Sequence, residues 1–383
     1  MPDLVPAVNA ALATVIDPEI HRPITDLDMV SSVSVDEAGA AAVTVLLTIT
    51  GCPMADTIES SVRQAVTSVP GVTSLDLTMS AMSDEQRAEL KRKLRGGRDE
   101  RDIPFAQADS RTQVLLVASG KGGVGKSSVT ANLAMALAGL GRTVGVLDAD
   151  IYGHSIPQML GLMDAFPTSV DGMIMPVPSM GMKVISIGMM KESRDQVIAW
   201  RGPILDRALQ QFLADVYWGE LDFLVVDLPP GTGDVALSLG HKLPNAEVVV
   251  VTTPQQAAAE VAERAGTMAS MLEQKVIGVV ENMAYLEAEC PHCGQSHRVD
   301  VFGTGGGTEV ARTLTSRLGY EVPLLAEVPI DPELAAGGDE GVPLVATAPQ
   351  RPAAAAIIEL ARLLSARKPS LAGKKLGLTP VQS

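Results

Sequence analysis

Cysteines, aromatic residues and long hydrophobic runs are scarce in this chain. Only three of the 383 residues are cysteines, an odd number that excludes a disulfide framework. Aromatic residues make up 3% of the sequence, so its cores have to be built from Ala, Val, Leu, Ile and Met. No apolar stretch approaches the ~18 residues of a membrane-spanning helix, and the N-terminus lacks a signal-peptide pattern. We therefore expect a cytoplasmic protein with no membrane partner.

The chain also lacks an excess of basic residues. The formal net charge is −15, from 45 acidic and 30 basic residues. Proteins that bind nucleic acid nonspecifically use lysine and arginine to neutralise phosphates, so this balance argues against nucleic acid as a partner. The chain is long enough for two or three domains of about 150 residues each.

The first hundred or so residues fall into two segments of different composition. Residues 1–82 alternate in the order helix, two strands, helix, strand, which predicts a small α+β domain. In residues 83–111, fifteen of the twenty-nine residues are charged. This composition cannot bury a core, so it predicts a charged linker, with one or two helical turns near Gln86 to Leu94.

Residues 112–366 alternate apolar strands with helices. This pattern predicts an α/β domain with a doubly wound, mostly parallel sheet, because strands covered on both faces read as continuous apolar runs. The tail, residues 367–383, is basic, contains Gly and Pro, and is expected to be disordered. The predicted strands are Val114–Ala118, Val144–Asp148, Lys183–Ile187, Phe223–Asp227, Val248–Thr252, Val276–Val280 and Leu324–Val328.

The glycine-rich segment Ser119–Ser128 carries the most specific signal. It follows a predicted strand and precedes Val129–Leu140, a predicted helix, and its spacing is that of a phosphate-binding loop. The glycines let the backbone wrap an anion, and the loop N–H groups point toward it. Lys126 should reach the β- and γ-phosphates, and Ser127 should hold Mg²⁺. The predicted nucleotide-binding residues here are Gly120, Lys121, Gly122, Gly123, Val124, Gly125, Lys126, Ser127 and Ser128.

Two further segments place aspartates at the ends of predicted strands. Phe223–Asp227 is an apolar run that ends in aspartate, and Asp227 would hold Mg²⁺ through water. Asp148 and Asp150 follow the second strand of the larger domain, at the carboxyl edge where such sheets bind ligands. For this last pair, the alternative is that the two aspartates cap the start of a helix.

Cys290 and Cys293 form a Cys-Pro-His-Cys motif. Two thiolates at this spacing can grip one metal ion or cluster, but zinc and a 4Fe-4S cluster both need four ligands. The sequence contains no second such motif, and a two-fold dimer would supply one by symmetry. Spacing alone favours zinc, with His297 as a possible third ligand, and a redox dithiol is a further alternative.

Together these motifs resemble the deviant Walker A ATPases, a family that includes the nitrogenase iron protein, the Min and Par positioning ATPases and the Mrp/ApbC iron–sulfur carriers. The resemblance rests on Lys-Gly-Gly-Val-Gly-Lys-Ser with its extra lysine, Lys121, on Asp-Leu-Pro-Pro-Gly-Thr-Gly-Asp, and on Glu-Asn-Met upstream of Cys-Pro-His-Cys-Gly. It covers residues 112–366 and is closest to the Mrp/ApbC pattern.

This resemblance implies several residue roles. Lys121 would reach across a homodimer to the partner's nucleotide and act in catalysis with Lys126 and Asp150. Asp148 would support Mg²⁺ through water, Asp150 would position the attacking water, and Asn282 would contact adenine. The resemblance also implies that Cys290 and Cys293 of two subunits bridge a labile 4Fe-4S cluster.

The N-terminal segment resembles the small domain found in iron–sulfur assembly factors and fused to many Mrp proteins. The residues that carry this likeness are Asp17-Pro18-Glu19 and Thr50 to Met54. They place Cys52 after a strand. There it would either contact a cluster or be a buried, inert thiol.

The sequence therefore predicts an ATP-hydrolysing iron–sulfur cluster carrier. Its cofactors would be ATP, Mg²⁺ and a 4Fe-4S cluster, and its partners a second copy of the chain, apo iron–sulfur proteins and assembly factors. One alternative is a positioning ATPase, although the tail is a poor membrane helix and the acidic balance is unfavourable for DNA. Another alternative is a zinc-stabilised dimer with a regulatory ATPase activity.

Overall fold

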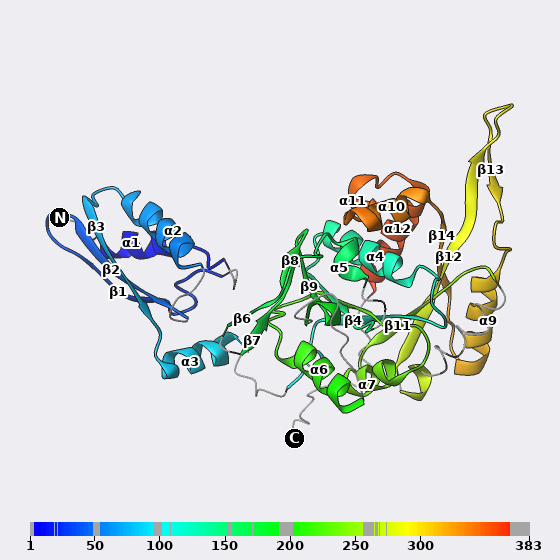
Figure 1. Cartoon of the computed structure of the whole chain (residues 1–383), viewed down its shortest axis with the longest axis horizontal. Coiled ribbons are helices and arrows are strands. Elements are labelled where there is room, and N and C mark those ends of the chain that lie inside the picture. The colour runs from blue at the N-terminus through cyan, green and yellow to red at the C-terminus, as the bar shows by residue number, and fades with distance from the viewer. Residues whose placement is uncertain are drawn as a thin grey trace, which may run out of the picture. The chain divides into compact units, whose positions relative to one another are not determined.

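The computed structural model describes residues 4–18, 20, 22–48, 54–94, 102–107, 109–151, 153, 155–170, 172–190, 202–255, 264, 267, 269–272 and 274–367. The chain divides into two compact units (Figure 1). The first contains Met1–Glu100 and Thr168–Met175, and the second contains Arg101–Pro167 and Pro176–Ser383. No helix of the described residues is long and apolar enough to cross a membrane.

The first unit contains a three-stranded sheet with two helices, followed by helix α3 (Asp84–Leu94). Its elements follow the predicted order and are α1 (Val5–Leu12), β1 (Val30–Val35), β2 (Ala40–Leu47), α2 (Ala55–Thr67) and β3 (Ser74–Ala81). β2 lies in the centre, antiparallel to β1 and parallel to β3. α2 buries Ile58, Val62 and Val66, which recur every four residues and so form one apolar face. A short hairpin, β6 (Thr168–Val170) with β7 (Met173–Met175), also belongs to this unit.

The charged segment contains more helix than its composition predicted. Helix α3 spans Asp84–Leu94, eleven residues rather than one or two turns. Ser83 and Gln86 form a capping box, in which the Gln86 N–H donates to Ser83 Oγ at 3.2 Å and the Ser83 N–H donates to Gln86 Oε1 at 2.9 Å. An ion pair between Arg92 and Glu89, three residues apart, adds support.

The second unit is built on a nine-stranded sheet. Its order is β13-β12-β11-β4-β10-β5-β9-β8, and β14 pairs with β12. Pairing is parallel throughout except for β8 and β13, which lie antiparallel to their neighbours. The strands are β4 (Gln113–Ser119), β5 (Val144–Asp148), β8 (Val177–Ser179), β9 (Met182–Ser186), β10 (Phe223–Asp227), β11 (Glu247–Thr252), β12 (Lys275–Glu289), β13 (Ser296–Val299) and β14 (Leu324–Ile330).

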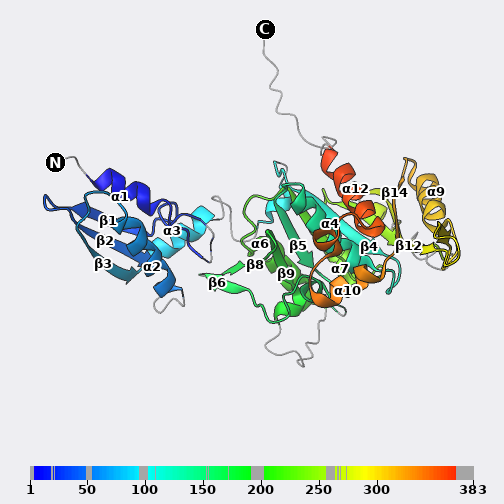
Figure 2. The same cartoon turned by 90° about the horizontal axis from the view of Figure 1, so that it is seen from above.

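Helices cover both faces of this sheet, which confirms the predicted doubly wound α/β class. Figure 1 shows α4, α10, α11 and α12 on one side and α6 and α7 on the other. β8 and β9 lie at one edge, with β12, β14 and α9 at the opposite edge (Figure 2). The helices are α4 (Lys126–Gly139), α5 (Ile156–Met159), α6 (Gly202–Ala214), α7 (Asp234–Lys242), α9 (Gly306–Leu318), α10 (Pro332–Glu340), α11 (Leu344–Thr347) and α12 (Pro352–Ala366), with short 3₁₀ turns η1 (Pro104–Ala106) and η2 (Ile187–Met190).

Strand β12 extends well beyond the rest of the sheet. Its first half lies between β11 and β14, and its second half pairs with β13, from Leu286 opposite Val299 to Glu289 opposite Ser296. The resulting hairpin projects from the sheet (Figure 1). All four residues of β13 are exposed, so it contributes nothing to the core. The sequence predicted only Val276–Val280 as strand here, and the hairpin is an addition to that prediction.

Candidate functional site

The glycine-rich loop joins β4 to α4 and is held at its N-terminal end by hydrogen bonds of Ser119. Ser119 Oγ donates to the Lys121 carbonyl at 3.0 Å, and the Gly231 N–H donates to the Ser119 carbonyl at 2.8 Å. Gly125 precedes α4 with φ +77°, a left-handed conformation that favours glycine. A Cβ at Gly125 would lie 2.2 Å from Asn282 Nδ2, so the close approach of β12 requires glycine as well.

Asp227, at the end of β10, is the centre of a buried polar cluster behind the loop. It is fully buried and lies 2.7 Å from Lys126 Nζ, so the two form an ion pair. Ser127 Oγ donates to Asp227 Oδ2 at 2.6 Å, and Thr130 Oγ1 donates to Asp227 Oδ1 at 2.7 Å. The structure therefore brings together three predicted residues. Thr130 is an addition, whose signal in the sequence is its position one helical turn after Lys126.

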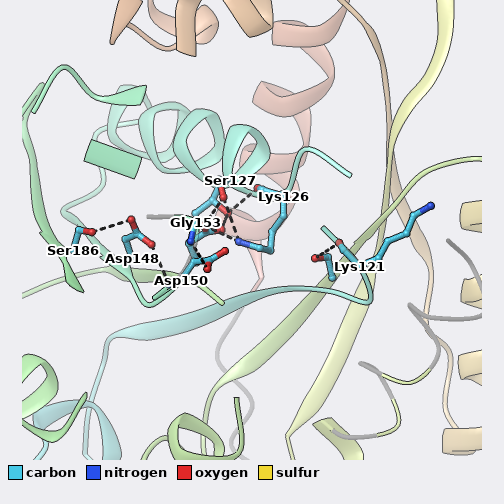
Figure 3. Close-up of polar contacts among 10 residues, drawn as sticks. Lys121, Lys126, Ser127, Asp148, Asp150, Gly153 and Ser186 are labelled. Carbon is cyan, nitrogen blue, oxygen red and sulfur yellow. Dashed lines mark hydrogen bonds and ion pairs between the residues drawn. The ribbon is translucent and has the colours of Figure 1, made fainter. Parts of the chain in front are cut away.

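Asp148 and Asp150 occupy different environments (Figure 3). Asp148 is fully buried, accepts from Ser186 Oγ at 2.9 Å, and accepts from the Asp150 N–H at 3.1 Å. Its burial, together with the charge of Asp227, raises the pKa of Asp148 to about 8. Asp150 instead borders the cleft described next, where its Oδ1 accepts from the Gly153 N–H at 2.9 Å.

Neither aspartate caps the following helix. The residue preceding α5 is Ser155, and the helix begins at Ile156. The helix-cap alternative for the pair is therefore wrong. The sequence did not predict the contact between Asp148 and Ser186. Both residues end strands, β5 and β9, so they lie together at the carboxyl ends of the strands.

A cleft of about 730 Å³ lies against the loop. Its volume is within the range of small-molecule sites. Asp148, Asp227 and Asn282 do not line it, but Ser127, which does, donates to Asp227. The loop side offers N–H groups, Lys126 and the Ser127 hydroxyl, which suits a phosphate chain with Mg²⁺. The residues that line the cleft are Ser119, Lys121, Gly122, Gly123, Val124, Gly125, Lys126, Ser127, Ser128, Asp150, Ile151, Gly153, Ser155, Met159, Leu205, Pro229, Pro230, Gly233, Asp234 and Val235.

Lys121 and Asn282 lie on the side of the loop away from the aspartates. The Lys121 side chain points away from Lys126 (Figure 3), and its Nζ donates to Gln255 Oε1 at 3.2 Å on the exposed surface. Asn282 is buried, and its Nδ2 donates to the Val124 carbonyl at 2.9 Å. Its Oδ1 is buried without a hydrogen-bond partner within the described part of the chain.

Cys290 and Cys293 lie in the turn between β12 and β13. The turn is closed by two backbone hydrogen bonds: the Gly294 N–H donates to the Cys290 carbonyl at 2.8 Å, and the Cys290 N–H donates to the Gln295 carbonyl at 2.9 Å. Both thiols are free, with Cys290 half-buried and Cys293 exposed. The backbone N–H groups of His292 and Cys293, followed by the Cys293 thiol, lower the pKa of Cys290, which favours its thiolate form.

Within the described residues, no group of three or more His, Cys, Asp or Glu side chains is arranged to hold a metal ion. His297, considered as a third zinc ligand, lies opposite Ala288 in the hairpin. The described part of one chain therefore presents two thiols and not a closed metal site. Cys52, the third cysteine, lies outside the described residues.

A phosphate loop with its lysine, serine and strand-end aspartate, set on a parallel sheet, defines a P-loop NTPase. Residues 110–365 match the ParA family model, described as NUBPL iron-transfer P-loop NTPase, and the chain belongs to that family. Residues 6–77 match the iron-sulfur cluster assembly protein model. Both predicted resemblances are thereby confirmed.

Full-length relatives support the same assignment. A Mycobacterium leprae protein is 52% identical over 378 residues, which cover 99% of this chain and 97% of the relative. A Synechocystis protein is 37% identical over 366 residues, covering 94% and 97%. Both are named iron-sulfur cluster carrier protein. Among solved structures, a nucleotide-binding protein from Archaeoglobus fulgidus in complex with ADP is 39% identical, with a TM-score of 0.50, over 62% of this chain and 92% of that one.

Proposed function

We propose that this protein is an ATP-dependent iron–sulfur cluster carrier. It binds MgATP at the phosphate loop, hydrolyses it, and holds a 4Fe-4S cluster between the cysteine pairs of two subunits for delivery to apo-proteins. The observation that carries the proposal is that one unit pairs a phosphate loop, with its lysine, serine and strand-end aspartate, with half of a metal site. The names of the full-length relatives support the same cargo.

The nucleotide half follows from the loop and its neighbours. Lys126 exchanges its contact with Asp227 for the β- and γ-phosphates when ATP binds. Ser127 and Asp227 are adjacent oxygen ligands suited to Mg²⁺, with Asp148 in support. The ion would neutralise charge on the phosphates. Asp150 borders the cleft, where its carboxylate can orient an attacking water.

The proposed cluster site follows from the number of ligands that a 4Fe-4S cluster needs. Cys290 and Cys293 give two thiolates in an exposed turn, and a 4Fe-4S cluster takes four. A two-fold axis beside the turn supplies the other two. Because the cluster then lies at a subunit interface on a projecting hairpin, a recipient protein can reach it.

Two residue roles extend this proposal. Lys121 already points away from its own Lys126, as a side chain that serves a partner's nucleotide must. Among the described residues the buried Asn282 amide oxygen has no hydrogen-bond partner, so it could accept from the amino group of adenine once nucleotide binding opens the cleft toward it. We retain both as proposed roles, together with the predicted boundaries at residues 82, 111 and 366.

Anaerobic reconstitution of the full chain tests the proposal. Iron and sulfide should reach about four atoms each per dimer, as a 4Fe-4S cluster requires. Cluster should move to an apo-protein acceptor, and phosphate should be released from MgATP. Stoichiometric zinc with no reconstitutable cluster would overturn the carrier function in favour of a zinc-stabilised ATPase.

A further inference from the structure

One strand, β12, connects the phosphate loop to the cysteine turn. It spans Lys275 to Glu289, and Cys290 follows directly. Residues 276–282 are buried in the sheet, whereas every residue from Tyr285 to Glu289 is half-buried or exposed. The position of the thiols therefore depends on the direction in which β12 leaves the sheet.

Where β12 leaves the sheet, the side chains of Glu281 and Asn282 hydrogen-bond to other elements. The Glu281 carboxylate accepts from the Gly307 N–H at the start of α9. The Asn282 amide donates to the Val124 carbonyl and packs directly on Gly125. Both residues are buried, at 2% exposure each, so neither contact can be exchanged freely for water. The backbone of the phosphate loop is thus tied to the root of the hairpin.

The next residue, Met283, has an unusual backbone. Its φ is +57°, a left-handed conformation that residues other than glycine rarely adopt. The register between β12 and β14 shifts between Asn282 and Leu286, around the same residue. Strained backbone that persists at such a junction is a feature of switch regions, because the surroundings must hold it in place.

We propose that Asn282 and Met283 are positioning residues that couple nucleotide in the phosphate loop to the orientation of the cysteine turn. A displacement of Val124 and Gly125 is passed through the Asn282 amide to Met283, whose backbone sets the direction of the hairpin. From Met283 to Cys290 the strand spans about 23 Å, so a rotation of about 10° at Met283 moves the thiols by about 4 Å. The inference rests on the proposed function and explains how ATP would act on the cluster site.

Amide hydrogen exchange of the full chain, with and without MgADP, tests the coupling without needing a cluster. Protection of Gly120–Ser128 reports that nucleotide is bound. In the wild type, exchange in residues 284–299 should change by about fivefold or more, a typical lower range for coupled sites. Met283→Gly places at this position a residue that adopts the left-handed backbone without strain. This variant should lose the response of the hairpin and keep the protection of the loop.

The chain offers a matched control in Met180, the other left-handed methionine among the described residues, at φ +47° in the turn between β8 and β9. Met180→Gly should leave the hairpin response unchanged. Met283→Asn, which tolerates the left-handed backbone, should retain it even if Met283→Gly folds poorly.

Three other outcomes would each contradict a specific part of the proposal. A wild-type hairpin that does not respond to MgADP while the loop is protected overturns the coupling and leaves the proposed function standing. A Met283→Gly variant that responds like the wild type removes Met283 from the path. Absence of loop protection in the wild type contradicts nucleotide binding itself, and the inference with it.

Discussion

The phosphate loop and the cysteine turn differ in almost every physical respect. Lys126 and Asp227 are buried and each is fixed by neighbours of the same chain. Cys293 is exposed, and the strand that follows it, β13, is exposed at every position. The residues that face the phosphates are thus preorganised within one chain, whereas the proposed cluster site has only two of its four ligands in each chain. A closed set of four ligands retains its metal, so an incomplete set suits a protein that has to release one.

Substituting either cysteine of the turn should have the largest effect, on cluster binding. We expect Cys290→Ser or Cys293→Ser to abolish cluster binding, because one thiolate per chain leaves at most two ligands per dimer. Stability should change by less than about 0.5 kcal/mol, since both residues lie on an exposed turn. Iron and sulfide analysis after reconstitution measures the first effect, and urea unfolding the second. Retention of a full cluster in either variant would contradict the ligand assignment.

Substituting Lys121 tests whether the nucleotide site needs a cation beyond Lys126. A cation supplied by a partner contributes roughly 10³–10⁵ to phosphoryl-transfer rate in well-studied cases. Lys121→Ala should lower turnover by an amount in this range and largely spare MgATP binding, because its side chain points away from Lys126.

Mixing Lys121→Ala with Asp150→Ala chains shows whether Lys121 acts across the dimer. Each mixed dimer would contain one site in which both groups are intact. Phosphate release should therefore recover in the mixture, although each variant alone is inactive. If heterodimers are shown to form and no activity returns, Lys121 acts within its own chain or not at all.

Lys126 should affect activity and stability together, unlike the cysteines. Lys126→Ala removes the charge that faces the phosphates, which costs roughly 10²–10³ in rate for a single stabilising group. It also leaves Asp227 buried and unpaired, which costs about 3–5 kcal/mol of unfolding free energy. Trp218 is buried in the second unit, so urea unfolding followed by tryptophan fluorescence reports on that unit.

The double variant Lys126→Ala with Asp227→Asn separates the two effects. Neutralising Asp227 removes the unpaired charge, so stability should partly return, whereas phosphate release should stay low. Equal stability of the single and double variants would show that the ion pair does not hold the loop to β10.

The sequence predicted the strands around the phosphate loop better than the cysteine hairpin, β12 with β13, for a physical reason. β5 and β10 are continuous apolar runs that end in aspartate, and their bounds match the predicted strands. β13 has no buried face and hence no apolar alternation to detect. The length of α3 was underestimated because the charge of the segment was weighed without its capping box. Thr130 and Ser186 act through contacts between distant segments, and the residue type gives no sign that Met283 is left-handed.

The smallest expected effect is on the free energy of unfolding. It separates the cost of the loop's left-handed backbone from the cost of losing the loop's contact with β12. Gly123 and Gly125 have nearly the same left-handed φ, +80° and +77°, but an added Cβ meets nothing within 4 Å at Gly123 and meets Asn282 Nδ2 at Gly125. Without nucleotide, Gly123→Ala should lower the unfolding free energy by about 1–2 kcal/mol, the cost of the left-handed backbone. Gly125→Ala should lower it by about 1–3 kcal/mol more, since the Asn282 amide is pushed off the Val124 carbonyl and left unsatisfied.

Asn282→Ala in both backgrounds completes the comparison. The double-mutant cycle should show coupling between Asn282 and Gly125 and none between Asn282 and Gly123, because only Gly125 touches the amide. Urea unfolding by tryptophan fluorescence provides all the values. Equal costs at the two glycines would mean that the loop does not depend on β12, and the phosphate loop and the cysteine hairpin would then be mechanically separate.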